Sequence, residues 1–374
     1  MHTADTSRVS DWVNRFVRRP GETTISLEAV ALLVGAGFFI VAFPISFVVF
    51  WGRTLDITGP GSIGTYAAIG GAVVAILAVA LARIGVRSRG ERLLVRSDGL
   101  ALPDVRVRWY ESAAIALAYA VTALLGWEGI AVLLSDSFTG APVFAFPGAI
   151  LVAVAFALTA YICYLSAATL TPMSLSLVLA VFLVVGAFAS MLTATDPLWW
   201  QDNLSALGMS TNSSAWIFNG TLIVAGIIVT TIGRYATAQL PVETPEQQRG
   251  RRFVRIAMAL IGVFLACVGI FPVDEFFLLH NTVATGMAVA FAAVVIALPW
   301  LLPTIARVFV VLGYVYVAVI ALLGVFFATG YYNLTAVELI AAVLIFSWII
   351  VFLRTASVGM PVADDIAASQ AVTA

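Results

Sequence analysis

Polar side chains that could do chemistry gather in two short stretches between long apolar segments. The first, DPLWWQDNLSALG, carries carboxylates, amides and a hydroxyl, and the second, FPVDEFFLLHN, carries two carboxylates, a histidine and an amide. If the two stretches meet, they form one pocket that could bind a polar headgroup, an ion or a proton, or supply an acid and a base. The candidate ligand-binding residues are Asp202, Asn203, Ser205, Asp274, Glu275, His280 and Asn281.

A second interpretation of these residues is purely structural. Asp and Asn at helix ends cap helices and orient loops, and a lone histidine at a membrane interface needs no ligand. His2 and His280 are the only histidines, so a His-rich catalytic zinc site cannot be built. The chain also lacks a P-loop, a G-x-S-x-G elbow and an H-E-x-x-H motif. We therefore expect no metal and no cofactor, and we assign no catalytic residue.

One ionisable residue falls deep inside an apolar segment, where charge is costly and suggests function. Glu128 lies in TALLGWEGIAVLLSD and is flanked by Gly126 and Gly129, which would permit close helix approach or water entry. It could carry a proton, hydrogen-bond across helices, or reach into an outer vestibule. The residues alone leave these alternatives open.

The amino-acid composition indicates which class of protein, and so which kind of structural element, must position these groups. Of the 374 residues, 62% are hydrophobic and only 10% are charged, whereas a soluble domain carries roughly 25% charged residues. This departure excludes an ordinary soluble enzyme, a nucleic-acid binder and a disordered protein. The two cysteines, Cys163 and Cys267, both lie in apolar runs, so no disulfide scaffold is expected.

Ten apolar stretches are long enough to span a bilayer, and each can satisfy its backbone there only as a helix. The sequence therefore predicts an all-α, polytopic helical membrane protein with about ten transmembrane helices. The stretches are 29–51, 65–83, 112–135, 143–168, 172–195, 215–233, 256–273, 281–302, 308–329 and 334–353.

Arginine placement predicts the orientation, because short cytoplasmic loops carry the excess of positive residues. All 19 basic residues are arginine, and placing both termini in the cytoplasm puts every one of them inside except Arg53. We expect a multi-pass protein of the cell membrane, with a lysine-free composition that suggests a bacterial source. The stretch 241–250 (PVETPEQQRG) is expected to be a solvated cytoplasmic loop.

Aromatic residues near the predicted membrane surfaces indicate interfacial contacts. In the N-terminal tail, Trp12 and Phe16 share one helical face with valines, opposite a face of arginines. This pattern predicts an amphipathic helix on the inner leaflet, although packing on the protein's own loops is the alternative. Trp199 and Trp200 suit an outer aromatic belt.

The domain organisation follows from these segments. We expect a cytoplasmic tail with the amphipathic helix at 1–28, a four-helix membrane region at 29–168, a six-helix membrane domain at 172–354, and a mobile cytoplasmic tail at 355–374.

The C-terminal part, from about residue 172 to 354, resembles a known family through two motifs. These are D-x-x-S-x-x-G, on Asp202, Ser205 and Gly208, and F-P-x-D followed by H-N, which begins at Phe271 and ends at Asn281. They resemble the prokaryotic membrane proteins grouped as domain of unknown function 998, distantly similar to the Frag/DRAM/Sfk proteins. The resemblance implies a six-helix architecture and a weak link to membrane lipids.

Three functions remain open from the sequence. The favoured one is a non-enzymatic integral membrane protein whose outer polar pocket takes a lipid headgroup or a partner protein. The alternative is a secondary transporter or permease subunit that uses Glu128 or His280, and the third is an intramembrane lipid-modifying enzyme that uses Asp202 or Asp274 with His280. The expected partners are membrane lipids and another membrane protein, and no nucleic acid.

Overall fold

The computed structural model describes residues 24–88, 109–170, 172–209, 213–238, 244–303 and 305–358. In these residues, ten helices are long and apolar enough to cross a membrane, so the predicted all-α, multi-pass membrane architecture is confirmed. Many large apolar side chains on these helices are exposed, among them Ile40, Val48 and Leu133. So many exposed apolar side chains suit contact with lipid, whereas in water they would favour aggregation.

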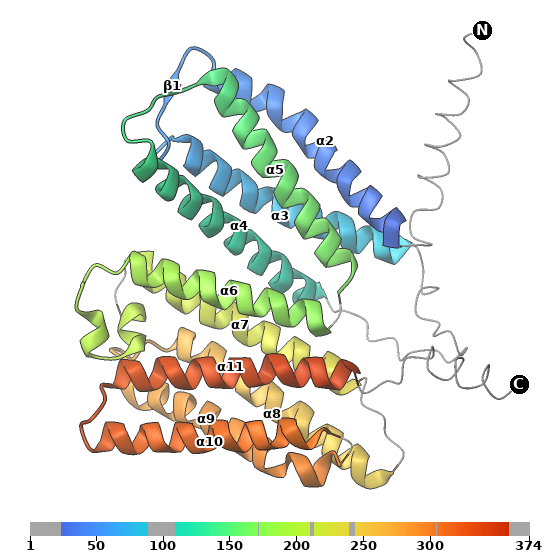
Figure 1. The fold of residues 1–374 in the computed structure, drawn as a ribbon, viewed down its shortest axis with the longest axis vertical. Coiled ribbons are helices and arrows are strands. Elements are labelled where there is room, and N and C mark those ends of the chain that lie inside the picture. Colours follow the sequence, from blue (N-terminus) through green and yellow to red (C-terminus); the bar gives the residue numbers. More distant parts are fainter. Residues whose placement is uncertain are drawn as a thin grey trace, which may run out of the picture. The chain divides into compact units, whose positions relative to one another are not determined.

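Contacts divide the chain into two compact units, made of residues 1–90 with 119–170, and 91–118 with 171–374. The first ten residues of α4 thus belong to the second unit. Figure 1 shows the elements of both units, whose bounds are α2 Thr24–Phe50, β1 Thr54–Leu55, α3 Ile63–Ser88, α4 Trp109–Ser137, β2 Val143–Phe144, α5 Ala145–Ala168, α6 Pro172–Leu192, η1 Trp199–Gln201, η2 Leu204–Gly208, α7 Ser213–Ala238, α8 Pro245–Ile270, α9 Phe277–Leu301, α10 Arg307–Ala328 and α11 Leu334–Val358.

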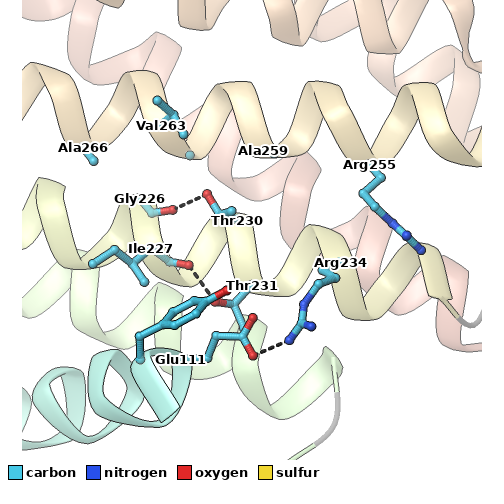
Figure 2. A pocket seen from close by; sticks show the side chains of 12 residues that line it. Glu111, Gly226, Ile227, Thr230, Thr231, Arg234, Arg255, Ala259, Val263 and Ala266 are labelled. Carbon is cyan, nitrogen blue, oxygen red and sulfur yellow. Dashed lines mark hydrogen bonds and ion pairs between the residues drawn. The ribbon is translucent and has the colours of Figure 1, made fainter. Parts of the chain in front are cut away.

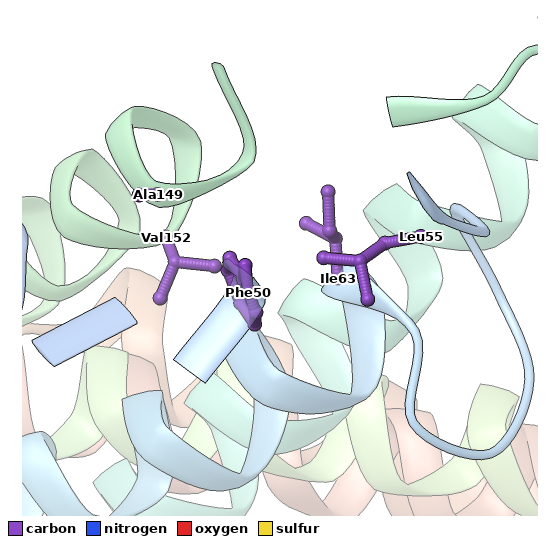
Figure 3. Packing of buried hydrophobic residues seen from close by; sticks show 5 residues of the cluster. All are labelled: Phe50, Leu55, Ile63, Ala149 and Val152. Atoms are coloured by element: carbon purple, nitrogen blue, oxygen red, sulfur yellow. The ribbon is translucent and has the colours of Figure 1, made fainter. Parts of the chain in front are cut away.

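In the first unit, α5 packs against both α2 and α3. Gly35 of α2 permits this, because a Cβ there would lie 2.9 Å from the Ala157 carbonyl oxygen of α5. A short antiparallel pair joins Thr54 to Phe144 and Leu55 to Val143, where the sequence predicted only helix at 143–144. Beside it lies the buried cluster shown in Figure 3, which comprises Phe50, Leu55, Ile63, Ala149 and Val152.

In the second unit, α6 to α11 form a bundle in which α7 packs on α6 and α8, and α9 packs on α8. Its aromatic core centres on Trp348 of α11, whose ring lies 5.0 Å from Phe309, 5.4 Å from Phe291 and 5.4 Å from Phe352 between centroids. Such close aromatic pairs add to the burial of large apolar surfaces.

The sequence prediction of a loop at 241–250 is wrong for residues 245–250. Helix α8 already begins at Pro245, with Thr244 as its N-cap. The Thr244 hydroxyl accepts the Gln247 N–H at 3.2 Å, and the Gln247 side chain accepts the Thr244 N–H at 3.3 Å. This capping box and the proline at the first position nucleate a helix in a polar sequence. The polar composition of this stretch was therefore not sufficient evidence for a loop.

Candidate functional site

The loop between α6 and α7 is folded into two short 3-10 helices, η1 and η2. It begins with an Asx turn, in which the Asp196 carboxylate accepts the Leu198 N–H at 2.8 Å. At its other end, Asn219 of α7 donates to the Gly208 carbonyl at 3.1 Å, and the Ser214 hydroxyl lies 3.2 Å from the Leu207 carbonyl. Residues 196–208, which include Asp202, are therefore held in place by hydrogen bonds, and we call this segment the platform.

His280, in the first turn of α9, joins this platform to the FPVDEF turn. Its Nδ1 lies 2.7 Å from the Phe271 carbonyl oxygen and its Nε2 lies 3.0 Å from the Ser205 hydroxyl. A carbonyl can only accept, so Nδ1 carries a proton, and in the neutral ring Nε2 accepts from Ser205. The side chain is buried, with 3% of its surface exposed. Two loops that are distant in the sequence thus share one buried hydrogen bond.

The FPVDEF turn itself is closed by local contacts. The Phe276 N–H donates to the Pro272 carbonyl at 2.9 Å, and the Phe271 and Phe276 rings meet at 5.5 Å between centroids. This turn leaves Asp274 and Glu275 exposed.

Helix α11 provides a further support through Glu338, for which the sequence indicated a structural role at the start of the last helix but not this contact. The Glu338 carboxylate accepts the Leu204 N–H at 2.6 Å and contacts the backbone N–H of Ser205. Glu338 therefore caps η2 from another helix, since the side chain of the N-cap residue Asn203 makes no capping bond. In addition, Asn333 donates to the Trp200 carbonyl at 2.9 Å. The one available signal was a carboxylate within an apolar helix.

The predicted site residues have different environments. Ser205 and His280 are in direct contact, whereas the Asn281 amide donates to Phe277 of its own helix at 2.9 Å. Asp202, Asp274 and Glu275 are exposed. Asn203 is half-buried, and its Oδ1 is buried with no hydrogen-bond partner in the described part of the chain. That buried acceptor calls for a water or a ligand donor.

The Ser205–His280–Phe271 arrangement matches the order of nucleophile, base and orienting group used in covalent catalysis. The serine is 9% exposed and the histidine 3%, so the hydroxyl is not presented to a substrate. Both ring nitrogens are engaged by Ser205 and Phe271, and neither carboxylate proposed as a partner for His280 bonds to it. The geometry fits a structural link between two loops.

The remaining predicted residues are Glu128, which lies outside this site, and the four interfacial aromatic residues. Glu128 is half-buried on α4 in the first unit, and a Cβ at Gly126 or Gly129 would meet no atom of the described chain within 4 Å. Trp199 is half-buried and Trp200 is 49% exposed, while Trp12 and Phe16 fall outside the described residues.

The platform and the residues that support it, from Asp202 to Glu338, fall in one stretch of the chain that can be compared with known families. Residues 177–355 match the family model described as protein of unknown function (DUF998). This part of the chain is similar to the DUF998 family, the same family that the D-x-x-S-x-x-G and F-P-x-D motifs indicated. No curated protein and no solved structure matched the chain. The description of the DUF998 family names no activity, so the function has to follow from the chemistry of the site.

Proposed function

We propose that this integral membrane protein is non-enzymatic and recognises a zwitterionic lipid headgroup at the end of the second unit that carries the platform. The observation that carries the proposal is the buried Ser205–His280 bond. It holds together two loops that expose the carboxylates of Asp202 on one side and of Asp274 and Glu275 on the other. A site preorganised in this way loses little entropy on binding.

The exposed groups define the ligand by complementarity. The Asp202, Asp274 and Glu275 carboxylates can only accept hydrogen bonds when ionised. A matching ligand must therefore donate, which favours an ammonium or hydroxyl group over a bare phosphate. A phosphatidylethanolamine headgroup provides such an ammonium.

Aromatic side chains beside the carboxylates support a ligand at a membrane surface. Trp200, Phe276 and Phe277 are 49%, 43% and 65% exposed. Such rings suit the boundary between headgroups and acyl chains, and their faces attract an ammonium.

The other functions that the sequence left open gain less from the structure. A proton-linked transporter would use His280 or Glu128, but both ring nitrogens of His280 are already engaged. An enzyme would need an accessible nucleophile, and Ser205 is buried. A partner protein on the same acidic and aromatic surface stays an outcome of the experiment below.

Photocrosslinking in native membranes tests the proposal. A photoreactive phenylalanine analogue at Phe277, which is 65% exposed, should attach to phosphatidylethanolamine, as identified by the mass of the adduct. The D274N/E275Q double variant should lower this adduct about three- to tenfold, because two exposed charge contacts are removed. The matched control E246Q removes an exposed acid at the other end of α8 and should change nothing.

Three results would contradict the proposal. An adduct with a protein in place of lipid would favour the partner function. Equal labelling of all lipids, or a D274N/E275Q adduct as strong as that of E246Q, would show that the carboxylates select no headgroup.

A further inference from the structure

A groove of about 500 Å³ runs between α7 and α8 in the second unit, and the first turn of α4 closes one side. Its volume falls within the usual range for sites that hold small ligands. Figure 2 shows its two ends, with Arg234, Arg255 and Glu111 towards one and Ile227, Val263 and Ala266 towards the other. The groove is therefore amphipathic along its length.

The apolar end exists because α7 and α8 cross at their glycines. A Cβ on Gly226 would collide with the Gly262 carbonyl oxygen and lie 2.8 Å from the Ala266 backbone nitrogen. The two backbones therefore touch, as small residues allow in membrane helices. Ala259 and Ala266 also line the groove, and their side chains are too small to fill it.

The charged end carries a net positive charge. Arg234 forms an ion pair with Glu111, and the Nε of Arg255 donates to the Thr237 hydroxyl at 2.9 Å. The positive charges of Arg234 and Arg251 also act electrostatically on Arg255. One carboxylate thus stands against two lining arginines, which leaves one positive charge to attract a single negative group.

The sequence places this charged end at a membrane boundary. Arg234 follows the apolar run of α7, and Arg255 directly precedes the apolar run IAMALIGVFLACVGI of α8. The groove therefore extends from the headgroup level towards the hydrocarbon core. Water-soluble anions match only its charged end, whereas a lipid matches both ends.

We propose that this groove binds an anionic phospholipid, with its phosphate at Arg234 and Arg255 and one acyl chain along Ile227, Ala259 and Ala266. Guanidinium groups offer several N–H donors in a plane that suits phosphate oxygens. The lipid belongs to the leaflet at the arginine-rich ends of the helices, which is the predicted cytoplasmic leaflet. This site is separate from the carboxylate platform and does not depend on the function proposed for it.

Native mass spectrometry of the full chain, released from nanodiscs of equal phosphatidylglycerol and phosphatidylcholine, tests this site. The wild type should retain phosphatidylglycerol preferentially. R255Q should lower that retention about tenfold, which is the usual scale for one charge-assisted contact. The matched control R252Q removes an exposed arginine of the same helix that does not line the groove, and it should retain the lipid like the wild type.

Three further variants separate the phosphate from the acyl chain and guard against misfolding. A259F fills the apolar end and should abolish retention, whereas L260F adds the same ring on the exposed side of α8 and should not. E111Q removes the carboxylate that competes for Arg234 and should increase retention, a gain that a misfolded protein would not show.

The source of the phosphate is tested by competition. Excess inorganic phosphate should leave the retained phosphatidylglycerol in place, because it lacks the acyl chain. Displacement by inorganic phosphate, equal retention of both lipids by the wild type, equal loss in R255Q and R252Q, or lower retention in E111Q would each overturn the proposal.

Discussion

Individual polar residues hold the second unit together across long separations in the sequence. His280 bonds to Ser205 75 positions away, Arg234 pairs with Glu111 123 positions away, and Glu338 caps Leu204 134 positions away. Buried polar groups are costly unless they are paired, so a largely apolar fold places each one against a specific partner. Residue types indicate which groups need partners, but only the packing of helices decides which groups meet.

The Ser205–His280 bond should contribute to stability. Ser205→Ala would leave Nε2 of His280 buried without its partner, at a cost of about 1–3 kcal/mol in the free energy of unfolding. Asn281→Ala is the matched control, because its amide bonds only to its own helix, and it should change stability by less than about 0.5 kcal/mol. Denaturation of the purified protein in detergent measures both, and equal effects would refute a structural role for the bond.

At the scale of elements, the sequence predicts the helices well and their polar ends poorly. The ten apolar stretches all appear as helices, because hydrophobic length is a strong signal for a membrane span. The start of α8 at Pro245 was missed, although T-P-E-Q is a capping box. The contact of α7 with α8 through Gly226 and Gly262 could not be predicted either, since glycines in apolar helices do not reveal which neighbour they face.

Two glycines of α7 test how closely these helices must approach. Gly226→Ala places a methyl group against the α8 backbone and should cost about 1–3 kcal/mol, because the helices must separate. Gly220→Ala, on the same helix, meets no described atom within 4 Å and should be neutral, or stabilising by up to about 1 kcal/mol through helix propensity. Thermal unfolding of the two variants in detergent distinguishes them, and similar melting temperatures would contradict the close contact.

At the scale of the whole molecule, the distribution of charge and aromatic residues along the helices indicates where the membrane surfaces lie. Five tryptophans at helix ends or in loops are 49–78% exposed, as an interfacial belt requires; they are Trp51, Trp109, Trp200, Trp216 and Trp300. The exposed carboxylates of Asp274 and Glu275 follow the C-terminal end of α8, while Arg252 lies near the N-terminal end of that helix. One crossing by α8 would therefore place the proposed zwitterionic and anionic lipid sites at opposite leaflets.

This orientation follows from the arginines and can be tested with single cysteines at the two ends of α8. With Cys163 and Cys267 replaced, Gln248→Cys and Glu275→Cys keep all 19 arginines, and acidic residues contribute little to topology. A membrane-impermeant maleimide should label position 275 in intact cells, and position 248 only after permeabilisation. Labelling of both positions from one side would mean that α8 does not cross the bilayer. The reverse pattern would invert the molecule and exchange the leaflets of the two proposed lipid sites, because each site is fixed to its own end of the same helix.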